Sequence, residues 1–368
     1  MQRAVHLILL SALLIVAARA EDRLAQARHL NNQAAALYAR GQLEAAEPLY
    51  RAAFAQSVDD PILAATISTN LGALYKRLDR YTDADSLYQH ALDLRRKWLP
   101  PTRPEIADSM NNLGEIYRLE GRYWEARNLT KAAVRALEQA DPASPDMPIF
   151  LNNWAGLERD LHHPEIAEPL LHRAWRLAEA SGGPAGRPVA IVLNSLGQVF
   201  ADKRDFAGAE PLYRRAAGIF EKPDTASPHD LAAVLCNLGR MLAALDRAEE
   251  ARATEFRALA LLDAEPHPNS LLRATILHNL GRILVAQGDL PDALPYFERS
   301  LAAEEQILGP ENPRLAAVLA DYSDAACRAG DRSRGRKLGK RAEQLLARER
   351  HDDRSTYTVD ASALVHPR

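Results

Sequence analysis

Five asparagines recur along the chain at regular intervals, and the chemistry of their side chains suits peptide recognition. They are Asn70, Asn112, Asn153, Asn237 and Asn279. An asparagine amide carries two N–H donors and one acceptor oxygen, so it can bond to a peptide group whatever side chain that peptide carries. The same amide can link neighbouring helices inside a protein. Either role satisfies a buried amide, which costs about 1–3 kcal/mol when it lacks partners, so both interpretations stay open.

Basic residues recur at fixed distances from these asparagines. Six of them follow an asparagine by three, six or seven positions: Lys76, Arg77, Arg118, Arg159, Arg240 and Arg282. Arginine forks match carboxylates well, so a lane of such residues would suit an acidic segment or a C-terminal carboxylate. The alternative is a solvated surface of little energetic weight. Glu115, Asp160 and Asp202 interrupt the lane.

Residue types used in catalysis and metal binding show no matching arrangement. The Gly-rich stretch 181–188 lacks the Lys-Ser/Thr pair of a phosphate loop and follows a predicted helix rather than a strand. His162 and His163 are adjacent in a predicted turn and the other histidines are scattered, which indicates no zinc site. No nucleophile elbow or triad spacing is present, nor a cluster of carboxylates as in a carbohydrate cleft. The sequence therefore predicts a protein that is not an enzyme, with no cofactor and no metal.

A repeated skeleton positions the candidate residues. From an anchor position, small residues follow 2, 14 and 21 positions later. Anchors 38 to 42 residues apart can be laid on the chain eight times: Asn32, Asn70, Asn112, Asn153, Ser195, Asn237, Asn279 and Asp321. The residues 14 positions after them are Ala46, Ala84, Ala126, Ala167, Ala209, Ala251, Ala293 and Gly335. A fixed period of this length predicts a stack of equivalent units.

Each copy of the skeleton has the features of a helical hairpin. Small residues let two antiparallel helices approach closely, and larger residues 5 and 18 positions after the anchor, such as Tyr75 and Tyr88, fill the space beside them. Nine positions after the anchor, six copies carry glycine or aspartate, which suit the turn that ends a helix. Prolines that mark the start of the next helix precede each later anchor: Pro61, Pro104, Pro145, Pro188, Pro228, Pro268 and Pro313.

This pattern resembles the tetratricopeptide repeat over about residues 30–347. The period, AEPLYRRAAGIF at 209–220 and LGPENP at 308–313 are similar to the long variety found in kinesin light chains and many bacterial proteins. The resemblance implies an all-α, right-handed α-solenoid of about eight antiparallel repeats, with helices of about 17 residues. It also implies that the first helix of each repeat lines a concave face, where the asparagines bond an extended peptide. Ser195 and Asp321 depart from the pattern, which makes the fifth and eighth repeats less suited to that contact.

The first 20 residues have the composition of a secretory signal peptide. Arg3 precedes an apolar run from Leu7 to Ala17, and Ala18-Arg19-Ala20 forms a small-x-small cleavage site. The run is shorter than the roughly 20 apolar residues that span a bilayer, so we expect cleavage rather than a membrane anchor. We therefore expect export to the periplasm or the extracellular space, with no stable membrane insertion of the mature chain.

The net charge bears on the class of partner, and the cysteine positions bear on disulfide formation. The formal net charge of the whole chain is −3, from 46 basic and 49 acidic residues, and the predicted signal peptide contributes two of the basic residues. A mildly acidic chain is not a general nucleic-acid binder. Cys236 and Cys327 lie in the sixth and eighth repeats, at least three helix layers apart, so we expect two free thiols.

The predicted organisation is a signal peptide at 1–20, a solenoid at 21–350 and a C-terminal tail at 351–368. The last repeat is rich in charges, as a terminal repeat facing water must be. In the tail, Tyr357, Val359, Ala361 and Ala363 alternate with other residues as in a short strand, although most such tails are disordered.

The sequence favours an exported, non-catalytic scaffold or adaptor that binds a protein or peptide, acidic if the basic lane is real, on its concave face. One alternative is a structural assembly factor of the cell envelope that self-associates. The sequence leaves open the partner's identity and the oligomeric state.

Overall fold

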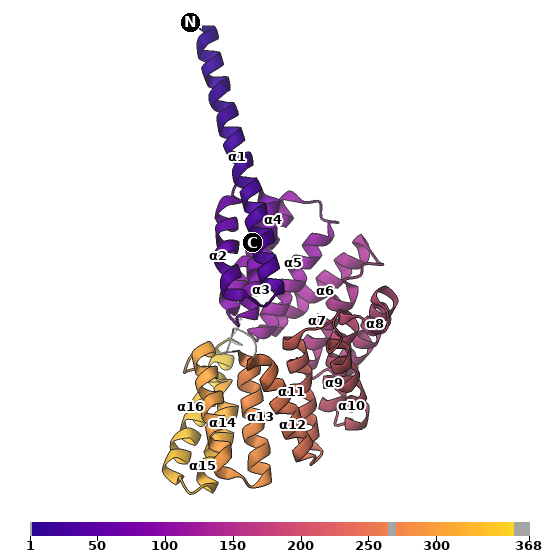
Figure 1. The fold of residues 1–368 in the computed structure, drawn as a ribbon, viewed down its shortest axis with the longest axis vertical. Coiled ribbons are helices and arrows are strands. Elements are labelled where there is room, and N and C mark those ends of the chain that lie inside the picture. Colours follow the sequence, from indigo (N-terminus) through magenta and orange to yellow (C-terminus); the bar gives the residue numbers. More distant parts are fainter. Residues whose placement is uncertain (1, 264–269, 357–368) are drawn as a thin grey trace, which may run out of the picture. The chain divides into compact units, whose positions relative to one another are not determined.

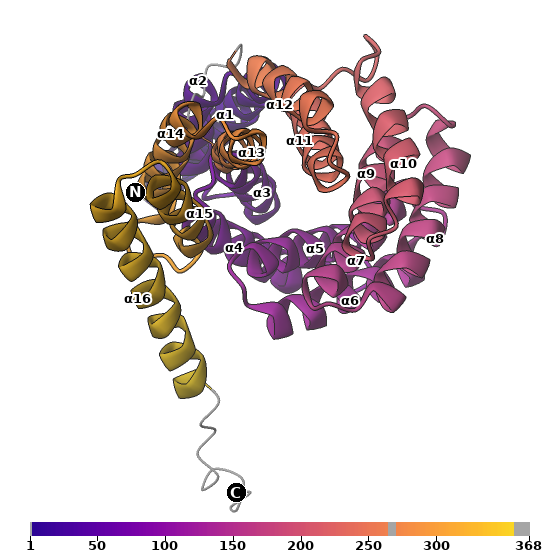
Figure 2. The same ribbon diagram turned by 90° about the horizontal axis from the view of Figure 1, so that it is seen from below.

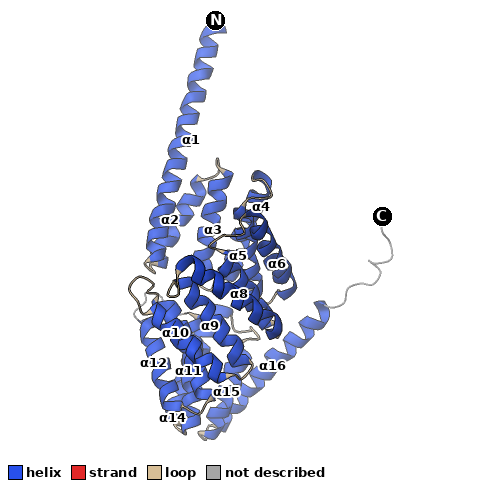
Figure 3. Ribbon diagram, turned by 90° about the vertical axis from the view of Figure 1, so that its right-hand side faces the viewer, coloured by secondary structure: helices blue, strands red, loops and turns tan. Residues whose placement is uncertain are grey.

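The computed structural model describes residues 2–263 and 270–356, and the side chains of residues 18–263 and 270–347. The described residues form helices joined by turns and loops, as the blue and tan ribbon of Figure 3 shows. The chain divides into two compact units, Met1–Ile219 (unit 1) and Phe220–Arg368 (unit 2). The predicted all-α solenoid is confirmed, because each unit is a stack of antiparallel helical hairpins.

Unit 1 is built from helices α1 to α10, the last of which ends one residue past the boundary (Figure 1). Their bounds are α1 Gln2–Ala39, α2 Leu43–Gln56, α3 Pro61–Arg77, α4 Tyr81–Trp98, α5 Pro104–Leu119, α6 Tyr123–Ala140, α7 Met147–Asp160, α8 Pro164–Gly182, α9 Arg187–Asp202 and α10 Phe206–Phe220. Odd-numbered helices are the first helices of the hairpins and even-numbered helices the second. Within unit 1, Figure 2 shows α5 and α7 in one layer and α6 and α8 in another.

Unit 2 continues the same alternation. Its helices are α11 Pro228–Ala244, α12 Ala248–Asp263, α13 Leu271–Gln287, α14 Leu290–Leu308, α15 Leu315–Arg328 and α16 Arg332–Thr356. Hairpins form between α11 and α12, α13 and α14, and α15 and α16, and each second helix also packs on the next first helix. Helices α2 to α15 have 14 to 19 residues, close to the predicted length.

The small residue two positions after the anchor is required by helix packing. A Cβ atom added at Gly72 would lie 2.9 Å from the ring of Tyr88, and one added at Gly197 would lie 2.8 Å from the ring of Tyr213. Such distances are too short for carbon atoms, so the ring of the second helix fills the space that glycine leaves on the first. The predicted pairing of small and large residues within a hairpin is confirmed.

The predicted turns are also observed. Gly41, Gly121, Gly288 and Gly330 have positive φ, as do Asp79 and Asp246. Two further residues at the same position of the repeat, His162 and Arg204, have φ of 59° although their side chains disfavour this conformation. At the other end of the hairpins, Pro61 is the first residue of α3, and the carboxylate of Asp60 accepts hydrogen bonds from the amides of Ile62 and Leu63.

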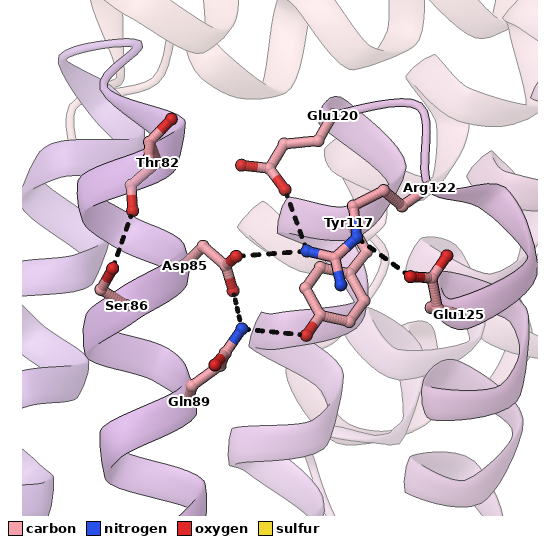
Figure 4. A network of polar contacts seen from close by, with 8 residues as sticks. All are labelled: Thr82, Asp85, Ser86, Gln89, Tyr117, Glu120, Arg122 and Glu125. Carbon is pink, nitrogen blue, oxygen red and sulfur yellow. Dashed lines mark hydrogen bonds and ion pairs between the residues drawn. The ribbon is translucent and has the colours of Figure 1, made fainter. Parts of the chain in front are cut away.

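A polar network holds consecutive hairpins of unit 1 together near the turns (Figure 4). The Arg122 guanidinium lies 3.5 Å from the ring centroid of Tyr117 and pairs with Asp85 of the preceding hairpin at 3.2 Å and with Glu125 at 3.1 Å. Gln89 of α4 donates to Asp85 and to the Tyr117 hydroxyl. Arg80 repeats the arrangement one hairpin earlier, over Tyr75 and between Glu47 and Asp83. The network joins α4 to the hairpin of α5 and α6, and its counterpart joins α2 to the hairpin of α3 and α4.

The two ends of the chain can be compared with the predicted signal peptide and the predicted C-terminal tail. Helix α1 runs through the predicted cleavage site after Ala20. No helix among the described residues is both long enough and apolar enough to span a membrane. Helix α16 continues six residues past the predicted end of the solenoid at 350, and the strand-like residues Tyr357 to Ala363 lie outside the described residues.

Candidate functional site

A pocket of about 370 Å³ lies in unit 2 along the first helices α11 and α13. Its polar lining includes Arg240, Asn279 and Arg282, three of the residues predicted from the sequence to bind a ligand. The rest of the lining is one acid, Asp246, together with Ile283 and four alanines: Ala243, Ala244, Ala248 and Ala286. Six positions after the anchor, repeats two to four carry Lys76, Arg118 and Arg159, whereas repeats six and seven carry the shorter residues Ala243 and Val285. The hollow therefore exists because long side chains are missing from this surface.

The two arginines of the pocket differ in their surroundings. Arg240 is exposed and makes no ion pair with any residue of the described chain. Arg282 is also exposed, but its Nε lies 3.4 Å from a carboxylate oxygen of Asp321 in α15. The same oxygen is 2.8 Å from His278 Nε2, and the bond with His278 holds the pKa of Asp321 below its ordinary value. Arg240 is thus the cation of the pocket that is most available to an anion.

Beneath the pocket lies a buried polar cluster of Asn279, Glu255 and Cys236. Asn279 Nδ2 donates to Glu255 Oε1 at 2.8 Å and to Cys236 Sγ at 3.3 Å. Glu255 is 0% exposed, and burial raises the pKa of its carboxyl well above the ordinary value. Burial also raises the pKa of the Cys236 thiol. Nδ2 makes both bonds, and the acceptor oxygen of Asn279 has no hydrogen-bond partner among the described residues.

Three of the five anchor asparagines make the same kind of contact, a bond to the preceding repeat, which the sequence analysis had left as an alternative. Asn70 Nδ2 donates to Asn31 at 2.9 Å, and Asn153 Nδ2 donates to Asn111 at 3.2 Å. Asn279 with Cys236 repeats this geometry. In each case the partner stands one position before the anchor of the preceding repeat. Linking of neighbouring repeats is therefore observed for three anchors, while their contact with a peptide stays a prediction.

The partner position was missed from the sequence, although its polar character was a usable signal. Across the repeats, the residues one position before the anchor are Asn31, Thr69, Asn111, Asn152, Asn194, Cys236, His278 and Ala320. His278 with Asp321 belongs to this series. Where the fifth anchor is Ser195 instead of asparagine, the Oδ1 of Asn152 is buried with no partner among the described residues. A shorter anchor side chain thus leaves one link of the series unmade.

The basic residues of unit 1 are paired with the acids that interrupt the predicted lane. Lys76 Nζ lies 2.7 Å from Glu115, and Arg118 pairs with Asp160. Arg159 contacts Asp160 at 2.9 Å and Asp202 at 3.7 Å. Burial alone would lower the pKa of Lys76 and raise that of Glu115, but their pairing reverses both shifts. In unit 1, the acids therefore neutralise much of the lane that the sequence suggested.

The remaining predicted residues lie on the same first helices. Asn112 and Asn237 are half-buried in α5 and α11, and Asn112 makes no side-chain hydrogen bond within the described chain. Arg77 lies 5.7 Å from the ring centroid of Tyr38. The described residues contain no cluster of three or more His, Cys, Asp or Glu side chains that could hold a metal ion.

A second buried glutamate, Glu158 of α7, has a complete set of partners. Arg127 binds both of its oxygens at 2.9 and 3.0 Å, Trp154 Nε1 donates at 2.8 Å, and His163 Nδ1 lies at 3.0 Å. These bonds hold the pKa of Glu158 below its ordinary value, although burial acts in the opposite direction. Glu158 takes the place of Tyr75 and Tyr117 in the repeat, and His163 that of Arg80 and Arg122. The pair replaces an aromatic ring and its arginine by a carboxylate and a histidine.

Comparison with known proteins identifies the repeats. The tetratricopeptide-repeat family model matches residues 63–139 and 272–348. These two segments are tetratricopeptide repeats. The predicted resemblance is confirmed, and it includes the kinesin-light-chain type: Protein KINESIN LIGHT CHAIN-RELATED 1 of Arabidopsis thaliana is 26% identical over 121 residues. That match covers 32% of this chain and 20% of the relative, so the chain spans about a fifth of that protein's length.

Solved structures share the fold over most of the chain. Aspartyl phosphate phosphatase F from Bacillus subtilis matches with a TM-score of 0.57 at 14% identity, covering 87% of this chain and 84% of that one. A Rap protein complexed with Competence and Sporulation Factor matches with a TM-score of 0.56 at 13% identity, covering 88% and 98%. At such low identity these matches show the tetratricopeptide-type fold alone.

Proposed function

We propose that this tetratricopeptide-repeat protein is a non-catalytic scaffold that binds a partner protein through an extended peptide segment on its first-helix face. The first-helix face is the surface that carries the anchors and the residues three, six and seven positions after them. One observation carries the proposal: Arg240, Asn279 and Arg282 line a single pocket, and each had been predicted to bind a ligand from its place in the repeat.

The chemistry of the pocket favours an acidic segment. Arg240 offers a planar fork that makes no ion pair within the described chain, although Asp246 also lines the pocket, and forks of this kind bind carboxylates through two parallel hydrogen bonds. Asn279 offers an acceptor for a peptide N–H beside it. The cations of unit 1 already have acidic partners, so we place acid recognition at repeats six and seven. Export, expected from residues 1–20, remains part of the proposal.

A random dodecapeptide library selected against the purified full-length chain tests this function. We expect enriched peptides to carry acidic residues and to lose about tenfold or more in affinity for Arg240→Gln, because a charge-assisted hydrogen bond contributes about 1.5–3 kcal/mol. Arg299→Gln is the matched control, since Arg299 is an exposed arginine of α14 without an ion pair to the described chain. Equal affinity for the two variants, or no enriched peptide, would contradict the proposal.

A further inference from the structure

Glu255 is a carboxylic acid at a repeat position where several other hairpins carry an aromatic ring, and packing alone does not require an acid there. The equivalent residues of other second helices include the rings of Tyr88, Tyr213 and Phe297, which pack against a small residue of the first helix. Glu255 occupies that space against Gly239, where an added Cβ would lie 2.7 Å from Glu255 Oε1. Its other oxygen, Oε2, is buried and has no hydrogen-bond partner in the described chain. Unlike Glu158, this buried carboxyl is only half satisfied.

The groups that face Glu255 come from both helices packed against α12. From α11 these are Cys236 and Arg240, and from α13 the group is Asn279. Arg240 immediately follows Gly239, so the carboxyl lies against the backbone from which the pocket's unpaired arginine extends. The positive charge of Arg240 favours the ionised form of Glu255, whereas burial opposes it more strongly. Burial thus favours the neutral form of a carboxyl that could otherwise pair with Arg240.

We propose that the protonation of Glu255 controls binding of an anionic group in the pocket. When Glu255 is protonated, it holds Asn279 in place and leaves Arg240 free for an acidic segment of the partner. When Glu255 is ionised, its carboxylate competes with that segment for the same guanidinium. The proposal rests on the proposed function, because it names the control of the same site.

The direction of the effect follows from mass action. If only the protonated form binds, the apparent Kd equals the intrinsic Kd divided by the protonated fraction, so affinity falls as pH rises through the pKa of Glu255. Far above that pKa, each pH unit weakens binding by up to about tenfold. By the same linkage, an acidic ligand that occupies Arg240 raises the pKa of Glu255 further.

The test uses the full-length chain and an acetylated, amidated hexa-aspartate peptide, whose carboxyls are almost fully ionised above about pH 5.5. Its Kd is measured by fluorescence anisotropy at steps between pH 5.5 and 9 for wild type, Glu255→Gln and His278→Gln. We expect the wild-type Kd to rise as pH passes through the pKa of Glu255, by up to about tenfold per pH unit above it. The Kd of Glu255→Gln should stay constant, because glutamine accepts the Asn279 bond without ever becoming charged. His278→Gln, which removes the titratable partner of Asp321, should keep the wild-type dependence.

A second measurement follows the titration of the Glu255 carboxyl directly, first without ligand and then with peptide. In a chain carrying ¹³C-labelled glutamate, the Glu255 carboxyl signal, assigned by its loss in Glu255→Gln, should titrate at higher pH than the exposed glutamates and move higher still when peptide is added. A pH-independent wild-type Kd, or the same dependence in Glu255→Gln, would overturn the inference and leave the proposed function intact. Failure of the wild type to bind hexa-aspartate at every pH would overturn both.

Discussion

Removing the charge of Glu158 should destabilise unit 1 far more than removing a charge from its surface. Glu158 is 0% exposed and accepts from Arg127, Trp154 and His163, so its loss leaves three donors without their acceptor. Breaking a buried ion pair by deleting one partner costs about 3–5 kcal/mol. Arg127 is one-third exposed and can be rehydrated, so the lower end of this energy range applies. In Glu158→Gln, the amide oxygen can still accept a hydrogen bond, so the loss should be smaller than in Glu158→Ala. We expect about 2 kcal/mol for Glu158→Gln and about 3 kcal/mol for Glu158→Ala.

Urea unfolding followed by tryptophan fluorescence measures this loss in unit 1 selectively. The four tryptophans, Trp98, Trp124, Trp154 and Trp175, all lie in unit 1. With a slope of about 2 kcal/mol/M, the Glu158→Gln midpoint should fall by about 1 M. The matched control is Glu138→Gln, which removes the partner of Arg173 from a pair in which both side chains are more than one-third exposed. Such pairs contribute about 0–1 kcal/mol, so the control midpoint should move by less than half as much.

The pH dependence provides an independent check of the charge. The folded-state pKa of Glu158 is lower than that of the unfolded chain, so the stabilisation is present above the ordinary value of 4.5 and is lost as pH falls through the folded pKa. The difference in unfolding free energy between wild type and Glu158→Gln should therefore become smaller below about pH 4.5. Equal midpoints for Glu158→Gln and Glu138→Gln at pH 7 would refute the view that this carboxylate is bonded and ionised.

Two further predictions concern the turns and the thiols. Arg204 has φ of 59° and Gly121 has φ of 80° at equivalent turns, so Arg204→Gly should stabilise unit 1 and Gly121→Ala should destabilise it, each by about 1 kcal/mol in the same urea assay. Midpoints that shift in the same direction would contradict this. Cys236 is buried with a raised pKa and Cys327 is exposed, so Ellman's reagent should label one thiol in the native chain and two in urea. Rapid labelling of both thiols without denaturant would show that Cys236 is accessible.

The hairpins could be predicted from the sequence because their determinants are local and repeated. Gly72 and Tyr88 belong to one hairpin, and the same pairing of small and large residues recurs in later copies. Proline and positive-φ positions mark helix ends through backbone geometry alone. Arg204 was not recognised as a turn residue and His162, although placed in a turn, was not predicted to be left-handed, because neither side chain favours that conformation.

The candidate site was harder to predict because it depends on contacts between repeats. The period places Lys76 on the first-helix face, but it does not show that Glu115, 39 residues later, reaches its ammonium group. Likewise, the asparagine anchors were visible, whereas Asn31 and Asn111 as their partners were not. Periodicity tells which face a residue occupies. Whether its charge or amide is satisfied depends on side-chain reach across the interface between hairpins.

A regular repeat also makes its departures informative. In such a stack, each position performs the same packing task in every copy, so a residue that breaks the series needs a separate physical reason. Glu158 and Glu255 both place a carboxyl where most other copies place an aromatic or aliphatic side chain. Arg127, Trp154 and His163 fully satisfy Glu158, so its departure is explained by stability alone. Glu255 keeps one buried oxygen without a partner and lies against the backbone next to Arg240, so its departure is better explained by a task at the pocket than by packing.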